Sequence, residues 1–200
     1  MTNFVYLASQ SPRRRLLLEQ LGVRYELLLA DSAEDSEALE VARENEAPDN
    51  YVHRVTALKL DAAMARLARR MLPLAPILCS DTTVALGRTI FGKPDDAAHA
   101  GRMLSALAGR SHQVLTAVAV QQGLQRFEAV STSQVSFQAM TAAQIKAYVD
   151  SGEPMGKAGA YAIQGKIAMH ITRIDGSYSG IMGLPLWETA LLLQAAGLEI

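Results

Sequence analysis

The sequence has only one cysteine, Cys79, so the chain cannot form an intramolecular disulfide or a cysteine-rich zinc site. Its four histidines are scattered, and none of them has the H-x-x-x-H spacing of paired metal ligands. No apolar segment approaches the ~18 residues of a membrane-spanning helix. The N-terminus places its arginines after its apolar residues, the reverse of a secretory signal peptide. These absences predict a soluble, cytoplasmic protein with no membrane partner.

The chain also lacks a large net charge, because 19 Lys and Arg residues stand against 20 Asp and Glu residues. General polyanion binders carry a strong basic excess, so the composition argues against nucleic acid as a partner. The near-zero total conceals local blocks. Arginines at 13–15 precede an acidic region at 26–50, and a second basic region follows at 51–70. A small charged substrate is compatible with this pattern.

Predicted strands and helices alternate along the chain, which is typical of an α/β protein. Half of the residues are hydrophobic, and no repeat or linker divides the sequence, so we expect one domain over residues 1–200. Strands are predicted at 4–8, 25–30, 77–80, 83–86, 114–120, 127–137 and 167–174. Helices are predicted at 11–22, 49–70, 95–109, 141–152 and 185–197, with a loop at 31–48. The long central strands favour a mixed, strongly twisted sheet.

The segment Ser9-Gln-Ser-Pro-Arg-Arg-Arg15 follows the first predicted strand and begins the first predicted helix. Arginines near a helix N-terminus are unfavourable, because this end already carries a partial positive charge. A bound anion would relieve the conflict, and strand–loop–helix junctions commonly bind phosphate. A solvated basic patch is the alternative, and this segment alone leaves both interpretations open.

Three further positions could carry chemistry. Asp81 ends a predicted strand, where α/β proteins tend to bind ligands, so it could hold a metal or accept a proton from water, or else cap a turn. Residues 87–93 have the glycine and lysine spacing of a P-loop, but Pro94 replaces the Ser or Thr that binds Mg²⁺. Lys93 could still point at an anion. The amide of Gln164 could contact a ligand or the backbone.

Together these segments resemble the Maf family of nucleoside triphosphate pyrophosphatases. Each motif is weak alone, but their joint order over residues 7–190 is specific. The motifs are Leu7-Ala-Ser-Gln-Ser-Pro-Arg-Arg14, Tyr51-Val-x-Arg54 with Lys59, Ser80-Asp-Thr82, Gly92-Lys-Pro94, Ser151-Gly-Glu-Pro154, Lys157-Ala-Gly-Ala-Tyr161, Ile163-Gln-Gly165, Gly176-Ser-Tyr178 and Gly183-Leu-Pro-Leu186.

The resemblance implies a fold and a reaction. The family has an elongated mixed sheet with a central cleft, shared with the inosine triphosphate pyrophosphatases, and is usually a cytoplasmic homodimer. It cleaves a nucleoside triphosphate between the α- and β-phosphates with a divalent metal cation, Mg²⁺ or Mn²⁺. The products are the monophosphate and pyrophosphate.

The resemblance also assigns roles to individual residues. Those expected to face the phosphates are Ser9, Arg13, Arg14, Lys59 and Lys93. Asp81 would be the general base and, with Glu34, would hold the metal. Members of the family often read Pro-Asp-x-Asp-Glu near Glu34, whereas this chain reads Ala30-Asp-Ser-Ala-Glu34-Asp35, so Asp31 or Asp35 could substitute.

Three positions distinguish the specificity branches of the family. Arg13, Thr82 and Gln164 match the branch that acts on dTTP and UTP. The branch that acts on 7-methyl-GTP tends to have a bulky residue, Gln and Glu at those places. An amide at 164 can donate to and accept from a pyrimidine edge. We therefore expect a dTTP/UTP pyrophosphatase, with a 7-methyl-GTP or modified-nucleotide enzyme, or a non-catalytic regulator of cell division, as alternatives.

Overall fold

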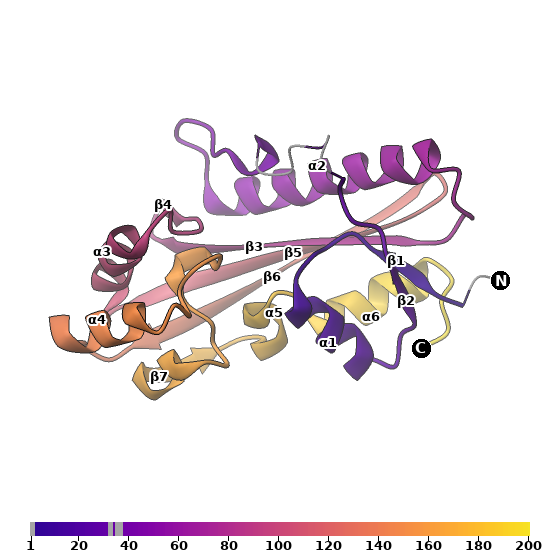
Figure 1. Cartoon of the computed structure of the whole chain (residues 1–200). Coiled ribbons are helices and arrows are strands. Elements are labelled where there is room, and N and C mark those ends of the chain that lie inside the picture. The colour runs from indigo at the N-terminus through magenta and orange to yellow at the C-terminus, as the bar shows by residue number, and fades with distance from the viewer. Residues whose placement is uncertain (1–2, 32–33, 35–37) are drawn as a thin grey trace.

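The structure is a computed structural model that describes residues 3–31, 34 and 38–200. In these ranges seven strands form one open sheet in the order β2-β1-β3-β5-β6-β7, with β4 paired to β3 (Figure 1). The strands are β1 (Val5–Leu7), β2 (Tyr25–Leu27), β3 (Ile77–Leu86), β4 (Thr89–Phe91), β5 (Ser111–Gln122), β6 (Gln125–Phe137) and β7 (Ile171–Asp175). β1 is parallel to β2 and β3, and the other pairs are antiparallel, so the predicted mixed α/β sheet is confirmed.

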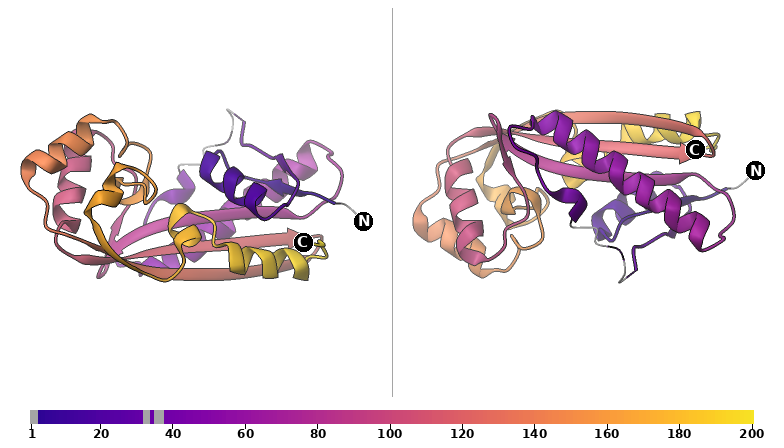
Figure 2. Two further views of the ribbon diagram at one scale, coloured as in Figure 1. Left: turned by 90° about the horizontal axis from the view of Figure 1, so that it is seen from below. Right: turned by 90° about the horizontal axis from the view of Figure 1, so that it is seen from above.

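Helices cover both faces of this sheet (Figure 2). The helices are α1 (Pro12–Gln20), α2 (Pro48–Arg69), α3 (Ala97–Leu107), α4 (Ala142–Asp150), α5 (Tyr178–Met182) and α6 (Leu186–Ala195). α2 packs its buried side chains, among them Leu60 and Ala63, against Ile77 on one face. α1 and α6 pack Leu18 and Leu193 against the opposite face. Because successive strand residues point to opposite faces, neighbouring residues of β3 enter different cores.

Several helix boundaries follow the local signals in the sequence. α2 begins at Pro48, slightly before the predicted cap, because proline is well suited to the first helical position. Asp96 caps α3 by accepting a hydrogen bond from the N–H of His99 at 2.6 Å. Thr141 and Gln144 form the predicted capping box of α4. Local signals in the sequence therefore located these helix starts, whereas the short helix α5, capped by Ser177, was not predicted.

Two predicted strands differ from the structure. The predicted break within 77–86 is absent, because β5 pairs with β3 continuously from Ile77 to Ala85. The predicted strand 167–174 begins only at Ile171, after a 3₁₀ helix at Lys166–His170. The N–H of Lys166 donates to the Glu153 carboxylate, which ties this segment to a loop instead of to a strand.

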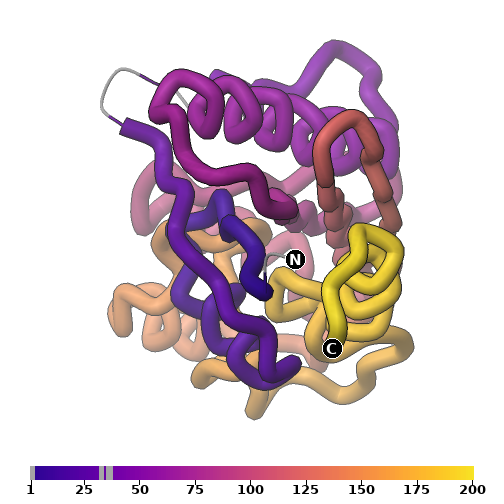
Figure 3. The backbone as a smooth tube through the Cα atoms, turned by 90° about the vertical axis from the view of Figure 1, so that its right-hand side faces the viewer, coloured from indigo at the N-terminus to yellow at the C-terminus, as the bar shows by residue number. Residues whose placement is uncertain are grey.

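Both chain ends lie at the same end of the molecule (Figure 3). The opposite end carries α3 and α4, which share a core with β4, β5 and β6 (Figure 1). None of the helices in the described ranges combines the length and apolarity needed to cross a membrane.

The edge of β3 is interrupted between two short partners. β1 pairs with β3 at Ile77 and Leu78, and β4 pairs with it from Val84 onward. Between them, residues 79–83 have no strand partner on that edge within the described part of the chain, although β5 pairs with their other edge. Asp81 lies at the centre of this gap, so the strand order itself opens a space beside the carboxylate.

Candidate functional site

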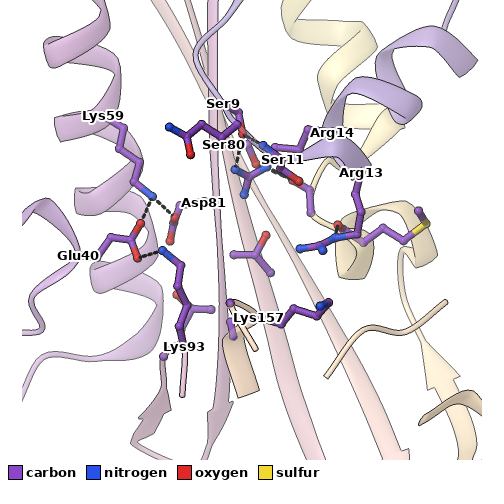
Figure 4. Close-up of a pocket in the computed structure, with 18 of the residues that line it drawn as sticks. Ser9, Ser11, Arg13, Arg14, Glu40, Lys59, Ser80, Asp81, Lys93 and Lys157 are labelled. Atoms are coloured by element: carbon purple, nitrogen blue, oxygen red, sulfur yellow. Dashed lines mark hydrogen bonds and ion pairs between the residues drawn. The ribbon is translucent and has the colours of Figure 1, made fainter. Parts of the chain in front are cut away.

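A cavity of about 650 Å³ opens at the gap in the edge of β3 (Figure 4). It brings together the nine residues to which the resemblance assigned a role, although these residues come from six different segments. Its lining includes Ser9, Arg13, Arg14, Glu34, Lys59, Asp81, Thr82, Lys93 and Gln164. Glu40 and Lys157 also line it, and the sequence had assigned neither of them a role.

The cavity wraps around both faces of β3 because the edge is open there. Asp81 points toward α2, where it contacts Lys59. Thr82 points toward the other face, where its hydroxyl accepts a hydrogen bond from Thr116 at 3.0 Å. Side chains of successive strand residues normally point into the cores on opposite faces of the sheet. Because the edge of β3 is open here, Asp81 and Thr82 both line the same cavity.

One side of the cavity holds what we call the paired cluster, formed by Lys59, Lys93, Glu40 and Asp81 (Figure 4). The Lys59 ammonium lies 2.5 Å from Asp81 Oδ1 and 2.7 Å from Glu40 Oε1. Lys93 Nζ lies 2.8 Å from the second oxygen of Glu40. Burial alone would lower the pKa of Lys59, but the charges of Asp81 and Glu40 outweigh it and raise the pKa. Two cations therefore neutralise two carboxylates.

The other side of the cavity holds what we call the open cluster, formed by Arg13, Arg14 and Lys157. Arg14 donates to the Gly183 carbonyl at 2.8 Å and to the Ser9 hydroxyl at 3.1 Å, and Arg13 donates to the Met182 carbonyl at 3.2 Å. Burial lowers the pKa of both guanidinium groups. Among the described residues, no carboxylate lies within ion-pair distance of any of the three cations.

Glu34 lines the cavity but is held by arginines of α2. Its carboxylate lies 2.5 Å from Arg66 Nη2 and 2.7 Å from Arg69. The hydrogen bond from Arg66 is the main reason that the pKa of Glu34 falls to about 2. Asp31 pairs with Arg69 at 2.9 Å, and Asp35 lies outside the described residues. The acidic region thus contributes two carboxylates to the cavity, Glu34 and Glu40. Glu34 pairs with arginines of α2, whereas Glu40 pairs with Lys59 and Lys93.

Glu40, like Lys157, is a lining residue to which the sequence assigned no role. It ends a 3₁₀ turn at Ala38–Glu40, and Tyr51 of α2 donates to its carbonyl at 2.8 Å. The only sequence signal was its membership of the acidic region, which contains nine carboxylates with no periodicity. Only the tertiary contacts separate Glu40 from the others.

Gln164 lies at the rim of the cavity, and its side chain is exposed. The structure gives its amide no hydrogen-bond partner among the described residues, so both its donor and its acceptor are available to a ligand. The loop around it is fixed by Glu153, whose carboxylate accepts from the N–H of Lys166 and from Tyr148. An amide whose hydrogen-bond donor and acceptor are both available, on a fixed loop, is suited to contact one edge of a ligand.

The oxygen donors in the cavity suit a divalent metal that arrives with phosphates. No cluster of three or more His, Cys, Asp or Glu side chains is found in the described ranges. Asp81 and Glu40 nevertheless place carboxylate oxygens around one ammonium, Lys59. Mg²⁺ is commonly held by one or two carboxylates, with waters and substrate phosphates completing its shell. The donor set therefore fits such a cation.

Known proteins resemble this chain over its whole length. A profile described as Maf-like protein matches residues 4–196. The dTTP/UTP pyrophosphatase of Polaromonas sp. (strain JS666) is 68% identical over 99% of this chain and 98% of its own length. The protein of the same name from Cupriavidus pinatubonensis is 65% identical, with full coverage of both chains. The Ham1 protein of Staphylococcus aureus matches 66% of this chain and 71% of its own at 12% identity, with a TM-score of 0.42, too low to support an argument.

The profile match and the curated relatives agree with the order of motifs read from the sequence. A match over nearly all of the chain, with relatives that share about two thirds of its residues, establishes kinship independently of any single site residue. The chain belongs to the Maf family.

Proposed function

We propose that this protein, as one domain, is a cytoplasmic nucleoside triphosphate pyrophosphatase that hydrolyses dTTP and UTP to the monophosphate and pyrophosphate. The observation that carries the proposal is a cavity in which Asp81 meets cations from four segments. A triphosphate is an anion with many oxygens, and arginine and lysine are suited to bind it. The full-length relatives named dTTP/UTP pyrophosphatase support the choice of substrate.

In this proposal Asp81 is the general base. Its carboxylate takes a proton from the water that attacks the α-phosphorus, and Lys59 keeps it oriented through the contact at 2.5 Å. Arg13, Arg14, Lys93 and the Ser9 hydroxyl face the phosphates. Fixed cations are most effective where negative charge accumulates on oxygen during the reaction.

A divalent cation, Mg²⁺ or Mn²⁺, would be held by Asp81 together with a second carboxylate, and it would act as a Lewis acid toward the phosphate oxygens. Glu40 is placed to be that second carboxylate, because it shares Lys59 with Asp81. Glu34 carries this role by resemblance, and it would first have to release Arg66.

Base selection is assigned to Arg13, Thr82 and Gln164, which all line the cavity. The exposed amide of Gln164 can donate to one pyrimidine atom and accept from another. We also propose that the protein acts as a homodimer, which rests on the family resemblance.

The test is a panel of nucleoside triphosphates with Mg²⁺ or Mn²⁺, with pyrophosphate and orthophosphate measured separately. Pyrophosphate release from dTTP and UTP is the expected result. Preferential turnover of 7-methyl-GTP would keep the chemistry and change the substrate. The absence of turnover on every triphosphate would overturn the enzymatic proposal and leave the regulatory alternative.

A further inference from the structure

The cations of the cavity differ in how far their charge is already compensated. Lys59 and Lys93 contact carboxylates, whereas the hydrogen bonds of Arg13, Arg14 and Lys157 to other described residues all go to neutral oxygens. Figure 4 shows Lys157 extending toward the side of the cavity where Arg13 lies, away from Glu40 and Lys93. Three like charges therefore converge on one part of the cavity, and no carboxylate of the described ranges forms an ion pair with them.

Lys157 is held in this position by its own loop. Its ammonium donates to the Glu153 carbonyl at 2.5 Å and to the Met155 carbonyl at 3.3 Å. Gly159, at φ +67°, lets the loop close against β3, because a Cβ there would come within 2.8 Å of Val84. A lysine with four flexible bonds is thereby restricted before any ligand arrives, which lowers the entropic cost of using it.

The charged form of Lys157 is disfavoured by its surroundings in the cavity. Burial is the main cause that lowers the pKa of Lys157, the nearby Arg13 lowers it further, and the Glu153 carboxylate offsets only part of this shift. An anion between the two cations would remove this repulsion, and no carboxylate of the described residues lies within ion-pair distance of either cation.

The proposed reaction delivers such an anion. Water oxygen forms a bond to the α-phosphorus, its proton passes to Asp81, and the bond from the α-phosphorus to the bridging oxygen breaks. The electron pair stays on that oxygen, which becomes part of pyrophosphate. The leaving group therefore gains negative charge as the bond breaks, and cations near it stabilise the transition state.

We propose that Lys157 is a substrate-binding residue that forms, with Arg13 and Arg14, a subsite for the pyrophosphate half of the substrate. This inference rests on the proposed function. It assigns the two halves of the cavity different tasks: the paired cluster handles water and the α-phosphate, and the open cluster handles the β- and γ-phosphates.

The test compares product inhibition in three variants. Lys157→Met is expected to weaken inhibition by pyrophosphate about 10- to 100-fold, since a hydrogen bond to a charged group is lost. Inhibition by the nucleoside monophosphate should stay within about twofold, because that half of the product lies elsewhere. Lys166→Met is the matched control, because Lys166 is exposed and lies outside the cavity lining.

Lys157→Arg keeps the charge and should retain most of the pyrophosphate inhibition, which tests whether the positive charge at this position carries the effect. Pyrophosphate inhibition unchanged in Lys157→Met, or monophosphate inhibition weakened equally, would overturn the subsite. Loss of inhibition as severe in Lys157→Arg as in Lys157→Met would also overturn it. Wild-type protein without turnover would instead overturn the proposed function, and calorimetry with inorganic pyrophosphate would then test the subsite directly.

Discussion

The paired cluster and the open cluster face each other across one cavity, but the positive charges are compensated by carboxylates only in the paired cluster, among the residues that the structure describes. In the paired cluster, Glu40 and Asp81 neutralise Lys59 and Lys93, so the groups are stable without a ligand. In the open cluster, Arg13, Arg14 and Lys157 donate to neutral oxygens and form no ion pair with any residue that the structure describes. An anion gains most where charge is uncompensated. The contrast indicates that the open cluster binds the anionic part of the substrate and that the paired cluster is arranged for the reaction.

The largest effect is expected from breaking the paired cluster at its base. Asp81→Asn removes the group that accepts the proton, and we expect turnover of dTTP to fall about 10²- to 10⁴-fold. Asp150→Asn, at the exposed end of α4, is the control and should retain activity. Steady-state pyrophosphate release measures both. An Asp81→Asn variant with near-normal turnover would mean that another group accepts the proton.

The next largest effect is expected from disturbing the open cluster at Arg14. The guanidinium donates to Gly183 from Nε and to Ser9 from Nη1, and the single nitrogen of a lysine ammonium does not reproduce this planar geometry. Arg14→Lys should lower kcat/KM for UTP by about 10- to 100-fold, in line with the loss of charge-assisted hydrogen bonds. Arg102→Lys on α3 is the control, because Arg102 lies outside the cavity lining. Equal kinetics for the two variants would argue against a substrate contact at Arg14.

A smaller effect of opposite sign is expected from Glu40→Gln. Removing this carboxylate leaves Lys59 and Lys93 less compensated, so the paired cluster becomes more like the open one. Calorimetry without divalent metal should then show pyrophosphate binding a few-fold more tightly than in wild type. Glu44→Gln, at an exposed position of the same acidic region that forms no ion pair with the described residues, is the control. Weaker metal-free binding in Glu40→Gln would contradict the proposed compensation.

The smallest effect on catalysis, but a clear one on stability, is expected from Glu34→Gln. The pKa of Glu34 lies at about 2 in the folded protein, below its ordinary 4.5, mainly because Arg66 donates to it. Its stabilising contribution is therefore fully present above about pH 4.5 and is lost as the pH falls toward 2. At pH 7 the variant should melt several degrees lower, since the buried Arg66 loses its partner.

The difference in Tm between wild type and Glu34→Gln should shrink as the pH is lowered from 5 to 3. Glu26→Gln provides the exposed control, with no comparable change. A Tm difference that does not vary with pH would exclude the ion pair as its source. A large rise in the metal concentration needed for activity would instead favour the metal role that the resemblance assigns to Glu34.

The sequence predicts the parts of the site that depend on local order. Ser9, Arg13 and Arg14 sit at a strand–helix junction that turn and cap signals define. Glu40 could not be singled out, because its role depends on a contact with a lysine 19 residues away. The continuity of β3 also escaped local rules, because pairing with β5 overrides the polar residues at its centre. The unmatched edge of β3 depends on three strands at once and has no signature in any one of them.

Because of that unmatched edge, the backbone amides of β3 differ in how they are shielded from solvent: some are paired with β5, and others face the cavity. The carbonyl of Leu78 accepts from Ala8, so the main-chain groups of alternate residues from Leu78 face the same edge. At Ser80 and Thr82 these groups open onto the cavity and have no neighbouring strand there within the described ranges. We therefore expect their amide hydrogens to exchange more slowly when the cavity is filled, whereas residues on the β5 side should exchange only when the sheet opens. The strand that carries Asp81 is thus a built-in reporter of occupancy, which amide exchange can read without any label.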